Sequence, residues 1–322
     1  MRLLQPDAAA AEAGLRAMRQ LAAAGSGSGV PARNLMLAAQ RHVLRTEHDI
    51  DALAPITPQE LGAAFRDPAI AHQFAQAMAV MALVEGPPTA AQGELMASYG
   101  RALGVDEPAL RVLGELAHHH LVLFRLDFMR RSHIADMVKG AVHREGFLAT
   151  ARALAAFRGM REDRAVLARY EALGRLPPDT LGHAFWKHCT DNGFPFPGAP
   201  FGFPEAGVYH DFTHVLSGYS TKPEGEVQIG GFTAGYKKHT PIFVILFVML
   251  TFGAGVNVTP VPQPEVTAIL AQEGLADRFF EAVERGGQVN TDLSDGWDHW
   301  AWVEKKLEQA RAELNVPPLT AA

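Results

Sequence analysis

The sequence predicts an all-α protein built from two helical bundles, the second of which carries a metal site. Helix start and stop signals recur along the chain, beginning with the capping-box pair Thr57 and Glu60. Between residues 30 and 160, no alternation of apolar and polar residues bounded by hairpin turns indicates strands. In the second half, a His-Asp-x-x-His motif at residues 210–214 has the spacing of one helix face.

Composition narrows the classes of function. The 322 residues are 48% apolar and 20% charged, which is ordinary for a globular protein. The net charge is -6 and no long basic run occurs, so nucleic acid is not an expected partner. Cys189 is the one cysteine, which excludes disulfides within the chain and CxxC zinc sites. A metal site must therefore use His, Asp and Glu.

Residues 1–30 are predicted to form an amphipathic helix followed by a flexible GSGSG linker. Charged residues such as Asp7, Glu12 and Arg16 interrupt its apolar positions. We therefore expect neither a secretory signal nor a mitochondrial transit peptide.

Residues 31–165 are predicted to form the first bundle. One helix has Phe74, Met78 and Met81 on one apolar face, and a later helix closes near Gly104. Asp106 is expected to cap the next helix, and further helical segments are predicted over residues 134–172. Three consecutive histidines at 118–120 point in three directions on a helix, which favours a partly exposed helix over a metal site.

Residues 166–318 are predicted to form the second bundle, after a break at Leu176-Pro177-Pro178. Asp179 is expected to cap a helix that Gly193 ends. The apolar run Ile242–Val256 is shorter than the ~20 residues that a membrane-spanning helix needs, so it predicts a buried helix or a membrane-surface element. A polar helix is predicted around 264–285.

The motif residues His210, Asp211 and His214 fall within about 100° of arc on a helix. Gly218 and the following STKPEG stretch break that helix, and a short turn would bring Glu226 of the next helix back towards the histidines. Such ligands suit Zn²⁺ and equally Fe²⁺ or Mn²⁺. Glu224 or His239 could replace Glu226 or join it, and an exposed polar helix face is the alternative interpretation.

The second half resembles the ubiquinone (coenzyme Q) biosynthesis family known as Coq-four, over about residues 170–318. Three blocks carry the resemblance: LPPDTLGHAFWKH, YHDFTHVLSGYSTKPEGEVQIGGF and LSDGWDHWAWVEKKLEQARAELNVPP. It implies a helical fold and a divalent metal, usually described as zinc. The ligands, and with them the candidate catalytic residues, would be His210, Asp211, His214 and Glu226.

The resemblance also implies a function. Family members bind polyprenyl lipids, associate peripherally with membranes and help to organise a biosynthetic complex. An activity that replaces the C1 carboxyl of the ring by hydroxyl is attributed to them. We therefore expect a polyprenyl lipid or quinone precursor and other quinone-biosynthesis proteins as partners. The expected location is the cytoplasm, at the inner face of a membrane, and a homodimer is left open.

The first half departs from that family. The stretch VMALVEGPPTAAQGELMASYGRALGVDEPALRVL resembles the TerB-like helical domain of tellurite-resistance proteins, with Glu85 where these domains often have Asp. The resemblance transfers no metal site to this half.

Three functions are compatible with the sequence. The first is a metal-dependent enzyme of the decarboxylase class. It would need iron with O₂, or a partner enzyme, because Zn²⁺ supplies no redox chemistry. The second is a non-catalytic lipid-binding scaffold, and the third is a helical stress-response protein. Three protein ligands would leave an open position for chemistry, whereas four would indicate a closed structural site. The motif offers three or four.

Overall fold

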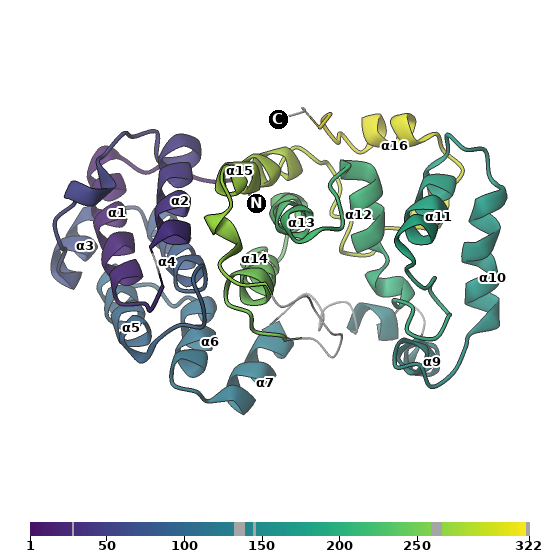
Figure 1. The fold of residues 1–322 in the computed structure, drawn as a ribbon, viewed down its shortest axis with the longest axis horizontal. Coiled ribbons are helices and arrows are strands. Elements are labelled where there is room, and N and C mark those ends of the chain that lie inside the picture. The colour runs from purple at the N-terminus through teal and green to yellow at the C-terminus, as the bar shows by residue number, and fades with distance from the viewer. Residues whose placement is uncertain (28, 132–138, 144–145, 259–265, 320–322) are drawn as a thin grey trace.

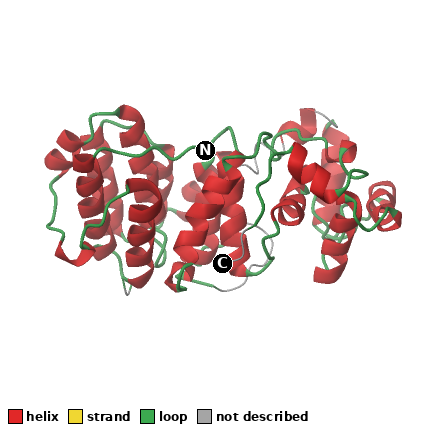
Figure 2. Ribbon diagram, turned by 90° about the horizontal axis from the view of Figure 1, so that it is seen from above, coloured by secondary structure: helices red, strands yellow, loops and turns green. Residues whose placement is uncertain are grey.

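The computed structural model of the chain contains helices and no strands within its described part, as Figure 2 shows. The structure describes residues 1–27, 29–131, 139–143, 146–258 and 266–319. The predicted all-α class is confirmed. Parts of two predicted helical segments, at 134–138, 144–145 and 264–265, lie outside the described residues.

The N-terminal helices form a bundle at one end of the molecule (Figure 1). They are α1 (Ala8–Ala23), α2 (Val30–Ala39), α3 (Pro58–Ala64), α4 (Pro68–Met81), α5 (Ala90–Leu103) and α6 (Pro108–Ala117). Helix α1 packs against α2, α3, α4 and α5, and its Leu15 and Leu21 are buried. The glycine-rich segment after α1 leads into α2, whose N-cap, Gly29, has a φ of 79°.

At the other end lie α10 (Arg164–Ala172), α11 (Leu181–Asn192), α12 (Tyr209–Ser217) and α16 (Leu307–Glu313). Helices α7 (Leu121–Arg131) and α9 (Phe147–Phe157) lie along the lower edge in Figure 1.

Between the two ends stand α13 (Pro223–Tyr236), α14 (Ile242–Val248) and α15 (Leu275–Gly286). Helices α13 and α15 approach closely because glycines face the partner backbone. A Cβ on Gly286 would lie 2.0 Å from the Phe232 carbonyl oxygen, and one on Gly235 would lie 2.5 Å from the Val283 carbonyl oxygen. No side chain larger than hydrogen fits at these two points.

Several predicted helix boundaries agree with the structure, although the helix predicted around residues 264–285 begins only at Leu275, as α15. Thr57 and Glu60 form the predicted capping box at the start of α3. Gly104 and Gly193 end α5 and α11 in the left-handed conformation that glycine adopts without strain.

Two predicted caps are wrong by one residue. Glu107, rather than Asp106, caps α6 by accepting a hydrogen bond from the Ala109 amide, because Pro108 takes the first helical position. Thr180, rather than Asp179, caps α11. The Asp179 carboxylate instead pairs with Lys306 at 2.8 Å.

The buried apolar residues form two clusters that do not follow the order of the chain. The first joins the N-terminal bundle to α14 and α15, with Met78 and Leu246 both fully buried in it. The second gathers residues of α10, α11, α12 and α16, together with part of α13. The domain division between residues 165 and 166 stays a prediction.

The apolar run lies inside the first cluster. Helix α14 continues as a π-helical turn, Met249–Gly253, whose residues are all buried. Of the two alternatives for this run, the buried helix therefore applies. Within the described ranges, no helix has both the length and the apolar character needed to cross a membrane.

Candidate metal centre

The centre is built by two consecutive helices and the turn between them. Helix α12 ends at Ser217, and Gly218 caps it with a φ of 82°. This left-handed residue reverses the chain, and α13 begins five residues later at Pro223. Glu226 consequently lies in the first turn of α13, where a carboxylate also interacts favourably with the helix dipole.

Three side chains converge at this turn. His210 Nε2 lies 3.3 Å from His214 Nε2 and 3.4 Å from Glu226 Oε2. His214 Nε2 lies 3.2 Å from Glu226 Oε1. The three side chains can present ligand atoms within 4.8 Å of one another, as a metal ion requires. The sequence prediction that the turn brings Glu226 to the histidines is confirmed.

His214 is oriented by a backbone group. Its Nδ1 lies 3.1 Å from the Tyr219 carbonyl oxygen, and the side chain is buried. A carbonyl oxygen only accepts hydrogen bonds, so Nδ1 carries the proton and donates it. In the neutral ring, the lone pair of Nε2 then faces His210 and Glu226. Histidine ligands in metal sites are commonly held in this way.

The spacing fits a metal ion. With bonds of about 2.0–2.2 Å to nitrogen and oxygen, two ligands at a tetrahedral angle lie about 3.4 Å apart. The nearest separations between pairs of side chains are 3.2, 3.3 and 3.4 Å, and the two that involve Glu226 use different carboxylate oxygens. With one ligand atom from each residue, the three atoms lie within 4.8 Å of one another. Two imidazoles and a carboxylate suit zinc as well as iron or manganese, so the donor set fits a divalent ion without selecting one.

The electrostatics of the metal-free centre are those of an ion pair. Burial opposes the charge on His210, but the charge and hydrogen bond of Glu226 outweigh it and raise the pKa of His210 to about 9. Burial likewise opposes the charge on Glu226, yet the two histidines lower its pKa to about 2. The metal-free centre is thus a neutral ion pair, and a cation that displaces the proton on His210 would meet the ionised carboxylate of Glu226.

Asp211 lies beside this cluster and is not one of its three members. Its Oδ1 is 4.0 Å from His188 Nε2, and burial raises the pKa of its carboxyl group. Its role as a fourth ligand stays a prediction.

The other candidates from the sequence lie elsewhere. Glu224 shares the first turn of α13 but is outside the cluster, and His239 lines a different pocket. His118 contacts the Gly114 carbonyl, and His120 pairs with Glu115. The described residues contain no second group of three potential ligands of this kind.

Two residues that contact the metal centre, His188 and Tyr219, were not recognised from the sequence. The ring of His188 stacks on that of His214, with centroids 5.5 Å apart. Burial, followed by the two neighbouring histidines, lowers the pKa of His188 to about 4, so this ring is neutral. Tyr219 acts through its backbone carbonyl, which no side-chain pattern reveals. The one available signal was Gly218, because a glycine four residues after His214 indicates a reversal of the chain.

Comparison with known proteins gives no further assignment. No protein-family model matches the chain, and no curated protein matches it.

Proposed function

We propose that the chain is a metal-dependent protein of quinone biosynthesis that binds a polyprenylated ring intermediate at the His210, His214 and Glu226 centre. The observation that carries the proposal is the convergence of these three side chains at separations that fit a single ion. The resemblance of the flanking blocks to the Coq-four family supplies the substrate class.

The number of ligands supports an enzyme over a scaffold. Three protein ligands leave at least one coordination position for a substrate or water, whereas closed structural sites use four. Because Asp211 is outside the group of three, it is available as a base. Burial raises the pKa of this carboxyl group, which makes Asp211 a stronger base than an exposed aspartate.

The proposed reaction replaces the C1 carboxyl of the ring by hydroxyl. Written in balance, Ar–CO₂H and H₂O give Ar–OH, CO₂, two protons and two electrons, so a two-electron acceptor such as O₂ or a partner enzyme must take part. A bound divalent ion would act as a Lewis acid on the ring carboxylate. Glu226 would supply a carboxylate ligand to the ion, and the two histidines would supply nitrogen ligands. The Tyr219 carbonyl fixes the tautomer of His214.

Exposed apolar side chains support contact with a lipid surface. Helices α7 and α9 carry large apolar side chains, which are usually buried in proteins, on their solvent-exposed surface. Val122, Phe147 and Leu148 are each more than 70% exposed. In addition, Ile242 and Ile245 of α14 line an apolar cavity of about 140 Å³, which offers room for part of an apolar tail.

A turnover assay tests the proposal. The purified protein, loaded in turn with Zn²⁺, Fe²⁺ or Mn²⁺, is incubated with a carboxyl-labelled polyprenyl hydroxybenzoate and an electron acceptor. Release of labelled CO₂ that is lost in Glu226→Ala is the expected result. Binding of the substrate without release under every metal and acceptor would favour the scaffold, and absence of binding would contradict both.

A further inference from the structure

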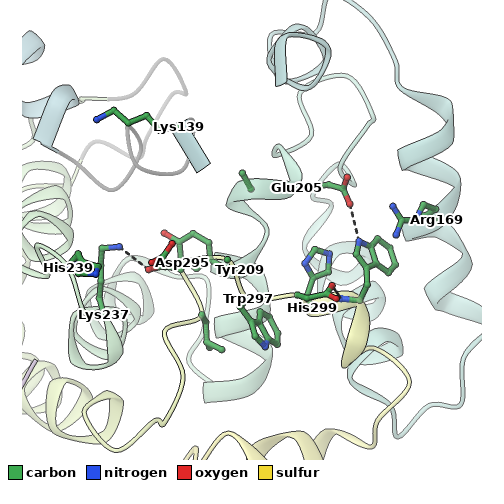
Figure 3. Close-up of a pocket in the computed structure, with 15 residues that line it drawn as sticks. Lys139, Arg169, Glu205, Tyr209, Lys237, His239, Asp295, Trp297 and His299 are labelled. Atoms are coloured by element: carbon green, nitrogen blue, oxygen red, sulfur yellow. Dashed lines mark hydrogen bonds between the residues drawn. The ribbon is translucent and has the colours of Figure 1, made fainter. Parts of the chain in front are cut away.

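A second pocket lies on another side of α12 from the metal centre. Tyr209 immediately precedes His210, so their side chains point about 100° apart around the helix. Tyr209 lines a cavity of about 580 Å³ together with the end of α13 and the segment 293–300 (Figure 3). None of the three candidate metal ligands lines this cavity. A cavity of this volume is typical of a small-molecule site.

A buried ammonium group faces this pocket. Lys237 follows the last residue of α13 and is only 5% exposed. Its Nζ donates a hydrogen bond to Ser294 Oγ at 2.9 Å, and Ser294 Oγ in turn donates to Asp292 Oδ1 at 2.7 Å. An ammonium group has three N–H donors. No other described residue accepts a hydrogen bond or forms an ion pair with Nζ, so two donors are available to a ligand.

Burial without a direct counter-ion is unfavourable for an ammonium group. The Asp292 carboxylate lies one hydroxyl group away from Nζ, so it attracts Lys237 from a distance without forming an ion pair with it. An anion bound in the pocket would contact Nζ directly and accept the two remaining hydrogen bonds. Tyr209 lines the same pocket, and its hydroxyl, which has no hydrogen-bond partner among the described residues, would add a third donor.

The remaining wall is aromatic. Trp297, His299 and Trp300 line the pocket from one short segment of the chain (Figure 3). Arg169 lies over the Trp300 ring, 4.0 Å from its centroid. Walls of this kind accommodate planar rings.

Carboxylates in the pocket limit the charge of the ligand. Glu205, Asp295 and Asp298 also line it. Glu205 accepts hydrogen bonds from Tyr170 and Trp300, which do not neutralise its negative charge. Lys139 and Arg169 line the cavity as well, so with Lys237 the three carboxylates are matched by three cationic side chains, and a ligand with one negative charge requires only the contact with Lys237.

We propose that this pocket binds a ring-bearing monocarboxylate, whose carboxylate accepts hydrogen bonds from Lys237 and Tyr209 while its ring lies against the aromatic wall. The site is separate from the metal centre and does not depend on the function proposed for it.

Calorimetric titration of the full chain with 2-naphthoate tests this site. The neutral 2-naphthamide has the same ring and shape but no charge, acetate has the charge but no ring, and 2-naphthyl phosphate carries a second charge. We expect 2-naphthoate to bind at least tenfold more tightly than each of the other three. Equal binding of the amide, tighter binding of the phosphate, or no binding of 2-naphthoate at millimolar concentration would overturn the proposal.

Matched variants locate the ligand. Lys237→Met should weaken 2-naphthoate binding at least tenfold, whereas Lys238→Met, which removes the exposed neighbouring ammonium, should leave it unchanged. Tyr209→Phe removes only a hydroxyl and should weaken binding several-fold, which keeps the test valid if Lys237→Met does not fold. Unchanged affinity in Tyr209→Phe and in any folded Lys237→Met would contradict the assignment.

Binding should also persist in Glu226→Ala, with or without metal. Loss of binding in that variant would place the acid at the metal centre instead and overturn the separate site.

Discussion

Metal binding at the His210 centre is expected to release a proton. In the metal-free protein the pKa of His210 is raised to about 9, so at pH 7 the ring is mostly protonated. A histidine with the ordinary pKa of about 6.5 would be about 25% protonated at that pH. The ligand must be neutral to bind a metal, so each bound ion displaces this proton.

The number of protons released per bound ion follows from these protonated fractions. The His210 side chain is 36% exposed, so solvent screens part of its interaction with Glu226. We therefore expect this ring to release between about 0.5 and 1 proton per ion at pH 7, compared with about 0.2 for an unperturbed histidine. Metal affinity should consequently rise with pH, by up to about tenfold per unit between pH 6 and pH 8.

Calorimetric titration of Zn²⁺ in buffers of different ionisation enthalpy measures the proton count. His239→Ala serves as the control, because this exposed histidine lies outside the cluster. Nuclear magnetic resonance titration of the metal-free protein should place the midpoint of His210 well above 6.5 and should lower it in Glu226→Gln. A proton count near 0.2 at pH 7, or a midpoint that Glu226→Gln does not change, would refute this description of the centre.

Three further predictions concern stability and reactivity. Gly286→Ala should lower the free energy of unfolding by at least about 1–3 kcal/mol in denaturant titrations, because its Cβ would meet the backbone of α13. The control Gly114→Ala, in a helix with nothing within 4 Å of the added Cβ, should be neutral or stabilising by up to about 1 kcal/mol, and equal losses in both would contradict this packing. The Cys189 thiol is buried and its pKa is raised, so iodoacetamide at pH 8 should modify it only after unfolding, and rapid labelling of the native protein would disprove its burial. In the metal-free protein, the stabilisation from His210 is complete below pH 6.5 and is lost as the pH rises towards 9, whereas that from Glu226 is complete above pH 4.5 and is lost as the pH falls towards 2. Thermal unfolding should therefore show this contribution at its maximum between pH 4.5 and 6.5, and replacing Glu226 by Gln should flatten the profile.

Local signals in the sequence were sufficient for much of the fold. Capping residues and left-handed glycines act within one or two turns of helix, so Thr57, Gly104 and Gly193 could be assigned without tertiary information. Local signals also predicted the metal centre, because His210 and His214 share one helix and Gly218 reverses the chain before the helix of Glu226.

Contacts between distant segments could not be predicted in this way. The buried cluster that joins α14 and α15 to the N-terminal bundle depends on side chains more than a hundred residues apart in sequence. The stacking of His188 on His214 depends on how α11 packs against α12. For the same reason Lys237 gave no signal, because its burial and its Ser294 partner arise only when the end of α13 meets the segment after α15.

The central claim is tested most directly by the metal content of the purified protein. Mass spectrometric metal analysis of the wild type should give about one divalent ion per chain after loading and removal of excess metal. His210→Ala and Glu226→Ala should lose it, while His239→Ala should retain it. A wild type without stoichiometric metal, or a Glu226→Ala variant that binds metal as the wild type does, would contradict the assignment of this centre.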